Sequence, residues 1–171
     1  EASREIQEFT DELSNWYVRR SRERYWGSEE TLDKTNAYMT LYTCLVTLSK
    51  LAAPFTPFIT EQIYNNLVAN LDSSAPISVH LTDYPVADES LINKTMEQQM
   101  EELLKVIVIA RNLRNTSGMK NRQPLRTLYV SSQNKLDNEY IMLLKDEMNI
   151  KEIRYISDAS MFIDYSLKPQ L

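Results

Sequence analysis

Apolar residues recur at three- and four-residue steps through much of the chain, and this spacing constrains the fold more than any other feature. In the first such stretch, Phe9, Leu13 and Tyr17 fall on one face of a helix that we expect to run to about Tyr25. The same spacing returns in three later stretches, each with apolar residues on one side. The sequence therefore predicts four helices that each bury one face.

Glycine and proline mark the ends of the first three predicted helices. Gly27 follows the first helix, and Ser28 is expected to cap the second, with two glutamates in its first turn. Pro54 interrupts the second helix. Thr56 before Pro57 supplies a cap and a first-turn proline for the third helix.

The pattern changes on both sides of the fourth helix, which is predicted at residues 88–115. Residues 72–86 contain Ser73, Ser74, Pro76 and Pro85, so we expect an extended connection with a short strand at residues 77–81. After the fourth helix, residues 127–131 and 153–157 resemble strands, with a helical stretch between them. Two strands make too small a sheet to be stable alone, so this unit must pack on the helices or on further sequence.

The predicted fold class is mainly α. We expect a four-helix bundle at residues 1–118, followed by a small, incomplete α/β unit of strand, helix and strand at residues 119–171. The longest aliphatic run, at residues 106–110, is far shorter than the roughly 20 residues of a membrane-spanning helix, so we expect a soluble protein. The chain begins at Glu1 without a signal-peptide pattern, and we interpret it as a segment of a longer protein.

The scarcity of three residue types excludes several kinds of site. Gly27 and Gly118 are the only glycines, so the sequence contains neither a dinucleotide-binding motif nor a phosphate-binding P-loop. Cys44 and His80 are the only cysteine and the only histidine, which excludes an internal disulfide and the usual four-ligand zinc site. We therefore expect no catalytic residue, metal or cofactor within this segment.

Positive charge is concentrated in two short segments, although the net charge of the chain is −5. The first basic segment, residues 19–24, carries four arginines and one glutamate. The second basic segment, residues 111–126, carries four arginines and one lysine and no acid. This segregation favours contact with one anionic partner. The alternative is that these arginines are solvated or paired with Asp and Glu.

Helical geometry divides the first basic segment into two faces. At about 100° per residue, Arg20 and Arg24 continue the apolar stripe, whereas Arg19 and Arg22 point away from it. We expect Arg20 and Arg24 to lie along the edge of the core and to meet a carboxylate or a phosphate there. Arg19 and Arg22 are expected to be available to a ligand's backbone. Trp26 either packs within the fold or stacks on a partner.

Five blocks of sequence, in order, resemble one family. They are LSNWYVRRSRERYWG, LVTLSKLAAPFTPFITEQIYNNL, SVHLTDYP, ARNLRNTSGMKNRQPL and LLKDEMNIKEI. Each block is modest alone, but the five together make nearly the whole chain resemble the isoleucyl-tRNA synthetases, which are class I aminoacyl-tRNA synthetases.

The resemblance implies a four-helix anticodon-binding bundle followed by the start of a junction domain. The whole enzyme would attach isoleucine to tRNA(Ile) with ATP and magnesium, and its catalytic and editing domains would lie upstream in the same chain. This segment would bind the anticodon arm, in a cytoplasmic and monomeric enzyme with no membrane attachment. Two alternatives stay open: the same module of a valyl or leucyl enzyme, and a helical protein-interaction domain that docks an acidic partner.

The candidate RNA-binding residues come from the two basic segments and their surroundings. By position in the resemblance, the family's basic helix corresponds to the arginines of the first basic segment, and one of its turns corresponds to residues 120–125. The complete predicted set is Arg19, Arg20, Arg22, Arg24, Trp26, Arg111, Arg114, Lys120, Arg122 and Gln123.

Overall fold

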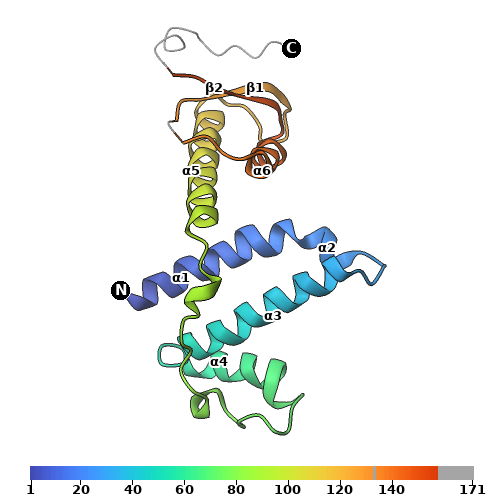
Figure 1. Cartoon of the computed structure of the whole chain (residues 1–171), viewed down its shortest axis with the longest axis vertical. Helices are drawn as coiled ribbons and strands as arrows, with labels where there is room; N and C mark the ends of the chain where they lie inside the picture. The colour runs from blue at the N-terminus through green and yellow to red at the C-terminus, as the bar shows by residue number, and fades with distance from the viewer. Residues whose placement is uncertain (133, 158–171) are drawn as a thin grey trace. The chain divides into compact units, whose positions relative to one another are not determined.

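The computed structural model describes residues 1–132 and 134–157. They form two compact units, Glu1–Ala87 and a second unit that begins at Asp88 (Figure 1). Helices dominate both units, and the second also contains a small sheet, which confirms the mainly α class with a small strand unit. The fourth long helix belongs to the second unit, while the domain boundary predicted at residue 118 stays a prediction.

The first unit opens with a helical stretch that changes its winding twice. Helix α1 (Ala2–Glu12) continues as the π-helical stretch Leu13–Val18, and α2 (Arg22–Trp26) follows after a break at Ser21. Ser21 leaves the α conformation, with φ −84° and ψ 5°, and its side chain is buried. The predicted first helix is therefore confirmed in extent, although it is not one regular α-helix.

Helix α3 (Leu32–Ala52) starts later than predicted. Its cap is Thr31, whose hydroxyl oxygen accepts a hydrogen bond from the backbone N–H of Lys34 at 3.1 Å. The expectation that Ser28 caps this helix is wrong, because the side chain able to reach the first free N–H groups is three residues further on. Helix α3 lies beside α1 and contacts α2 (Figure 1).

Helix α4 (Pro57–Tyr64) begins where the sequence predicts and continues as a π-helical stretch at Asn65–Ala69. Tyr64 is only 1% exposed and packs with Ala53 and Val79, while its hydroxyl donates to the carbonyl of Pro76 at 3.1 Å. This aromatic side chain therefore anchors the long connection that follows α4 to the rest of the first unit.

The short strand predicted at residues 77–81 is wrong, because a 3-10 turn, Val79–Leu81, is present instead. Glu61 of α4 explains the difference. Its carboxylate accepts hydrogen bonds from the Ser78 hydroxyl and from the backbone N–H of Val79, each at 2.9 Å. The backbone group that a strand would pair is thus held by a side chain from α4.

The second unit is built on α5 (Lys94–Thr116), preceded by a 3-10 turn at Glu89–Leu91. The Asn93 side chain caps α5 by accepting a hydrogen bond from the Met96 N–H at 3.1 Å. Its buried residues fall at helical spacing along one face and end with an arginine; they are Leu103, Ile107, Ala110 and Arg114. This face supports the rest of the unit.

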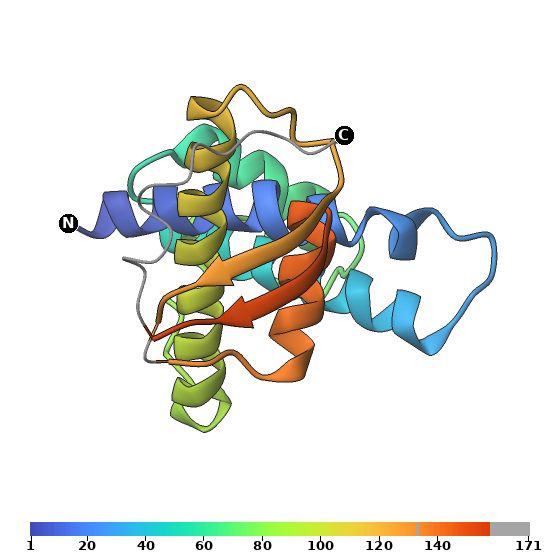
Figure 2. The same ribbon diagram turned by 90° about the horizontal axis from the view of Figure 1, so that it is seen from above.

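Strand β1 (Leu125–Val130), helix α6 (Asn138–Met148) and strand β2 (Ile150–Tyr155) confirm the predicted order of strand, helix and strand. The strands pair in parallel with Leu125 opposite Ile150, as the side-by-side arrows in Figure 2 show. Helix α6 packs against α5 and β2. Across the two described ranges, no helix combines the length and the apolar character needed to cross a bilayer.

Candidate nucleic-acid interface

Arg24 of the first basic segment is held within the fold. Its Nε and Nη2 atoms donate to the carboxylate of Asp33 at 2.8 and 2.7 Å, and Nη2 also donates to the Asp33 carbonyl at 3.2 Å. The hydrogen bond from Arg24 lowers the pKa of the Asp33 carboxyl. Arg24 therefore ties α2 to the start of α3, which is the carboxylate contact expected at the edge of the core.

Arg20 also follows the side of the helix that faces the fold. Its guanidinium carbon lies 5.4 Å from the ring centroid of Trp16, and both residues are partly buried. A guanidinium at this distance from an indole gains a cation–π attraction. Arg20 and Arg24 thus lie where the helical spacing places them.

Arg22 and Trp26 lie elsewhere on the same helical stretch and are exposed. The guanidinium carbon of Arg22 is 5.1 Å from the Trp26 ring centroid, and Trp26 is 77% exposed. Arg19 is exposed as well, and its Nε donates to the carbonyl of Asn15 at 2.8 Å. These side chains contribute to a surface pocket of about 400 Å³. The pocket, called the Trp26 pocket below, is lined by Ser14, Asn15, Val18, Arg19, Arg22, Tyr25 and Trp26.

Tyr25 is one of the residues that line the Trp26 pocket. Its ring packs on that of Tyr38 of α3, with centroids 5.0 Å apart, and the Tyr38 hydroxyl donates to the Tyr25 carbonyl at 3.2 Å. Burial, assisted by the neighbouring Tyr17, raises the pKa of Tyr25 to about 12. The phenol is therefore neutral at physiological pH and adds no negative charge beside the arginines.

In the second basic segment, Arg111 joins two helices. Its Nη2 atom donates to the carboxylate of Glu147 on α6, whose side chain is almost completely buried. The Arg111 side chain is 42% exposed, so part of it still borders solvent. The ion pair helps to hold α6 against α5.

Arg114, also predicted to bind RNA, is buried and bonded to the main chain. The residue is 2% exposed, and its Nη1 donates at 2.9 Å to the carbonyls of both Lys120 and Gln123. Its Nη2 donates to the carbonyl of Met148 at 2.6 Å. Burial lowers the pKa of Arg114. A phosphate group would have to open this turn to reach the guanidinium.

The turn that Arg114 holds presents two of the predicted residues, Lys120 and Arg122, as exposed side chains. Its other support is Asn149, in the left-handed conformation with φ 51°, whose Nδ2 donates to the Arg122 carbonyl at 2.9 Å. Gln123 is partly buried, and its N–H donates to the Lys120 carbonyl at 3.0 Å. The sequence analysis missed Asn149, although asparagine just after a helix is a known left-handed terminator.

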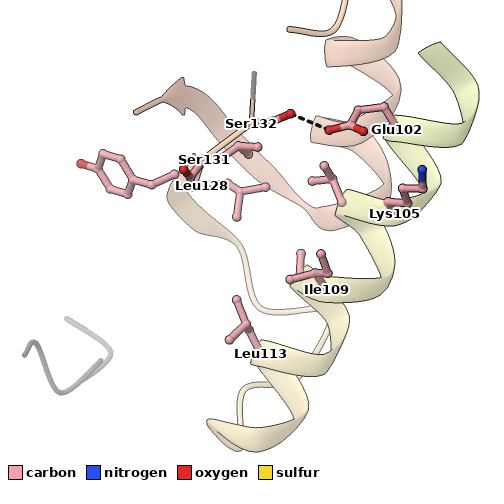
Figure 3. A pocket seen from close by; sticks show the side chains of 11 residues that line it. Glu102, Lys105, Ile109, Leu113, Leu128, Ser131 and Ser132 are labelled. Carbon is pink, nitrogen blue, oxygen red and sulfur yellow. Dashed lines mark hydrogen bonds between the residues drawn. The ribbon is translucent and has the colours of Figure 1, made fainter. Parts of the chain in front are cut away.

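An apolar groove of about 250 Å³ runs between α5 and β1 (Figure 3). Ile109 and Leu113 of α5 face Leu128 of β1 across it, and the Ser132 hydroxyl donates to Glu102 at 2.7 Å at one end. None of the predicted RNA-binding residues lines this groove, and the sequence analysis did not foresee it. In the described part of the chain, no group of three or more His, Cys, Asp or Glu residues is placed to hold a metal ion.

Comparison with known proteins identifies the family. The model of the anticodon-binding domain of tRNA ligase matches residues 1–130. Isoleucine–tRNA ligase of Clostridium tetani is 48% identical over 171 residues, covering 100% of this chain and 16% of that protein. The corresponding ligase of Bacillus thuringiensis is 44% identical over 170 residues, covering 98% of this chain and 16% of that protein.

A third relative has a lower identity to this chain. Isoleucine–tRNA ligase of Thermus thermophilus is 40% identical over 175 residues, covering 99% of this chain and 17% of that protein. The chain thus spans about one sixth of the length of these curated relatives. Because the family model covers most of the chain, the chain belongs to the anticodon-binding domain family of tRNA ligases.

Proposed function

We propose that this chain is the tRNA-binding module of an isoleucine–tRNA ligase and that it holds the anticodon arm of tRNA(Ile). The similarity to isoleucine–tRNA ligases along the whole chain is the observation that carries this proposal. The catalytic and editing domains would lie upstream in the same chain, in a cytoplasmic and monomeric enzyme. ATP and magnesium would be used there, outside this segment.

The exposed cations of both basic segments supply the phosphate contacts in this proposal. Arg22 in the first unit and Lys120 and Arg122 in the second have exposed side chains. Arg24, Arg111 and Arg114 shape the surface instead, because a carboxylate or main-chain carbonyls already bind their guanidinium groups. Phosphate contacts of this kind orient an RNA without reading its sequence.

The salt dependence of tRNA binding tests the phosphate contacts directly. Each phosphate contact that is lost should flatten the slope of log affinity against log salt concentration by about 0.7 to 0.9. We expect this change for Arg22→Ala and for Arg122→Ala, measured by filter binding to tRNA(Ile) across a range of salt concentrations. Unchanged slopes in both variants would remove the phosphate role from both segments.

Lys105→Ala is the matched control for this experiment. Lys105 lies on α5 outside the basic segments and pairs with Glu101 at 2.6 Å. Its replacement by alanine changes the net charge of the chain by the same amount as the replacement of one arginine. We expect the parent slope for this variant. A slope that falls as far as in Arg22→Ala would mean that total charge, rather than placed contacts, controls binding.

Two experiments address the alternatives to this function. Charging of tRNA with isoleucine, valine or leucine by the whole enzyme distinguishes an isoleucine ligase from a valine or leucine ligase, and the relatives support isoleucine. An acidic protein in the same filter-binding assay serves as the comparison for a protein-interaction domain. Equal retention of tRNA and acidic protein would contradict the tRNA-binding function.

A further inference from the structure

The sheet of the second unit is small, and each of its strands keeps one open edge. Strands β1 and β2 pair with each other, and within the described ranges no third strand joins either of them. A sheet of two strands is only marginally stable by itself. The edge of a strand carries a row of backbone N–H and C=O groups, which makes it a template for one more strand.

The apolar groove of about 250 Å³ lies beside β1, and no residue of β2 lines it. Leu128 of β1 faces Ile109 and Leu113 of α5 across the groove (Figure 3). The residues Ile109 and Leu113 are 60% and 52% exposed, which is high for aliphatic residues that face a sheet. Helix α5 thus presents apolar side chains that the two strands leave uncovered.

The sequence that follows β2 has the pattern of a strand with one apolar face. Residues 161–167, which lie outside the described part of the chain, read MFIDYSL. Strict alternation over seven residues is typical of a strand that buries one face. Pro169, two residues later, is of a type that seldom continues a strand. The apolar positions of this segment are Met161, Ile163, Tyr165 and Leu167.

The path from β2 to the open edge of β1 is short. The N–H of Ile156 donates to the carbonyl of Val130 at 3.0 Å, so the chain leaves β2 beside the last residue of β1. Two strand spacings, about 10 Å, separate β2 from a strand on the far side of β1. Residues 157–160 span up to about 14 Å when extended. A segment that turns back after this connection runs antiparallel to β1.

The groove and the segment also have similar lengths. On α5 the lining residues run from Glu102 to Leu113, which is about 17 Å at 1.5 Å per residue. A strand of seven residues extends about 20 Å from its first residue to its last. The apolar face of the segment is therefore long enough to cover the groove from end to end.

The open edge of β2 is less suited to a further strand. Lys151, Glu152 and Arg154 give β2 three charged residues, whereas Arg126 is the one charged residue of β1. The Nε atom of Arg154 also donates to the Glu152 carboxylate at 2.8 Å. Charged side chains on an edge strand oppose pairing with another strand. The charge pattern therefore favours strand addition at β1.

We propose that residues 161–167 add to the open edge of β1 as a third, antiparallel strand whose apolar face fills the groove. The strand order of the sheet is then third strand, β1, β2. Asp164 and Ser166, on the opposite face of the segment, point to solvent. The groove is thus part of the core of the second unit and not a ligand site. This inference is independent of the proposed tRNA binding.

The direction of β1 fixes which end of the segment meets which end of α5. Ser132, just after β1, donates to Glu102, whereas the turn before β1 is held by Arg114 near the other end of α5. Strand β1 thus runs antiparallel to α5, and a strand antiparallel to β1 runs in the same direction as α5. Met161 then lies near Glu102, and Leu167 lies near Leu113.

Cysteine labelling of the whole chain tests whether the segment covers the groove. In a Cys44→Ser background, Ile109→Cys reports on the groove and Val108→Cys is the matched control. Val108 is 58% exposed and Ile109 is 60% exposed, but Val108 does not line the groove. We expect iodoacetamide to modify Ile109→Cys at least about tenfold more slowly than Val108→Cys, because a packed strand must open before the reagent enters.

A charge placed on either face of the segment sharpens this test. Ile163→Asp should abolish the difference in labelling, because a carboxylate is unfavourable in an apolar groove. Ser166→Asp adds the same charge on the opposite face and should leave the difference unchanged.

Disulfide formation tests the direction of the strand. In the same Cys44→Ser background, Leu113→Cys combined with Leu167→Cys should form an intramolecular disulfide on mild oxidation. Leu113→Cys combined with Met161→Cys should not, because cysteines whose Cα atoms are more than about 7 Å apart cannot be bridged.

The outcomes decide the inference as follows. Equal labelling of Ile109→Cys and Val108→Cys would overturn it, and so would a difference in labelling that survives Ile163→Asp. A disulfide that forms with Met161→Cys and not with Leu167→Cys, or with neither, would also overturn it. If Ile163→Asp unfolds the second unit, which circular dichroism would reveal, the disulfide pair decides.

Discussion

The two basic segments look alike in sequence and differ in how the fold uses them. In the first basic segment, Arg22 stacks on an exposed indole at the surface. In the second, Arg111 and Arg114 turn toward α6, and exposed Lys120 and Arg122 follow on a turn. A local shortage of acids therefore does not predict whether an arginine is available to a ligand.

The groups that bind the arginines, and their distance along the sequence, explain this difference. Asp33, the partner of Arg24, lies nine residues away in the sequence, whereas Glu147 lies 36 residues from Arg111. Arg114 uses four main-chain carbonyls, which carry no formal charge and do not enter a charge count. The charge of Arg111 is thus partly neutralised by Glu147, a group that only tertiary folding brings to it.

Arg114→Ala should have the largest effect on stability. The change removes a buried guanidinium together with its hydrogen bonds to the carbonyls of Lys120, Gln123 and Met148. We expect a loss of about 3 kcal/mol in the free energy of unfolding, measured by urea titration. Arg114→Lys should recover only part of it, because a lysine cannot reproduce the planar set of donors. A loss below about 0.5 kcal/mol would contradict the structural role of Arg114.

Asn149→Ala should have the next largest effect. An alanine in the left-handed conformation is strained, and the bond from the Asn149 amide to the Arg122 carbonyl is lost. We expect a loss of about 1 to 2 kcal/mol, again by urea titration. Asn149→Gly is the control, since glycine accepts this backbone conformation, and it should cost clearly less. Equal losses in the free energy of unfolding for Asn149→Ala and Asn149→Gly would mean that the left-handed backbone conformation does not cause the loss.

The ion pair between Arg24 and Asp33 should give a smaller effect that depends on pH. The pKa of Asp33 is lowered in the folded state, so the fold favours the ionised carboxylate. Its stabilisation is complete above the unfolded value of about 3.9 and disappears as the pH falls toward the lower folded value. Asp33→Asn should therefore lower the melting temperature slightly at pH 7 and converge with the parent in acid. A difference in melting temperature between the variant and the parent that grows as the pH falls would contradict this prediction.

Arg22→Ala should have the smallest effect on stability. Its side chain lies on the exposed indole of Trp26, so truncation should change the free energy of unfolding by no more than about 0.5 kcal/mol. The same variant is expected to change the salt dependence of tRNA binding, which sharpens the contrast with Arg114. A stability loss as large as that of Arg114→Ala would mean that Arg22 is part of the core. It would contradict the difference proposed here between the two arginines.

Much of the fold follows from local signals in the sequence. Helix α4 starts at Pro57 as predicted, although the Thr56 side chain makes no capping hydrogen bond, and the order of strand, helix and strand near the C-terminus is correct. The cap of α3 was assigned to the wrong residue because Ser28 and Thr31 both carry a suitable hydroxyl, and only the backbone path decides between them. The strand expected at residues 77–81 fails because Glu61, from another helix, captures the local backbone.

Part of the candidate site was also predictable. Helical spacing correctly separated Arg20 and Arg24 from Arg22, because all three lie on a nearly continuous helical stretch. The exposure of Trp26 and the burial of Arg114 depend on what packs nearby, and spacing alone does not contain that information.

The buried position of Arg114 has a consequence for functional screening. Systematic alanine replacement scored by RNA affinity alone would rank Arg114 with Lys120, because a collapsed turn and a missing cation both lower the signal. The two mechanisms separate only when each variant is also assayed for folding. Arginines that organise a recognition loop from beneath can therefore be mistaken for residues that touch the ligand.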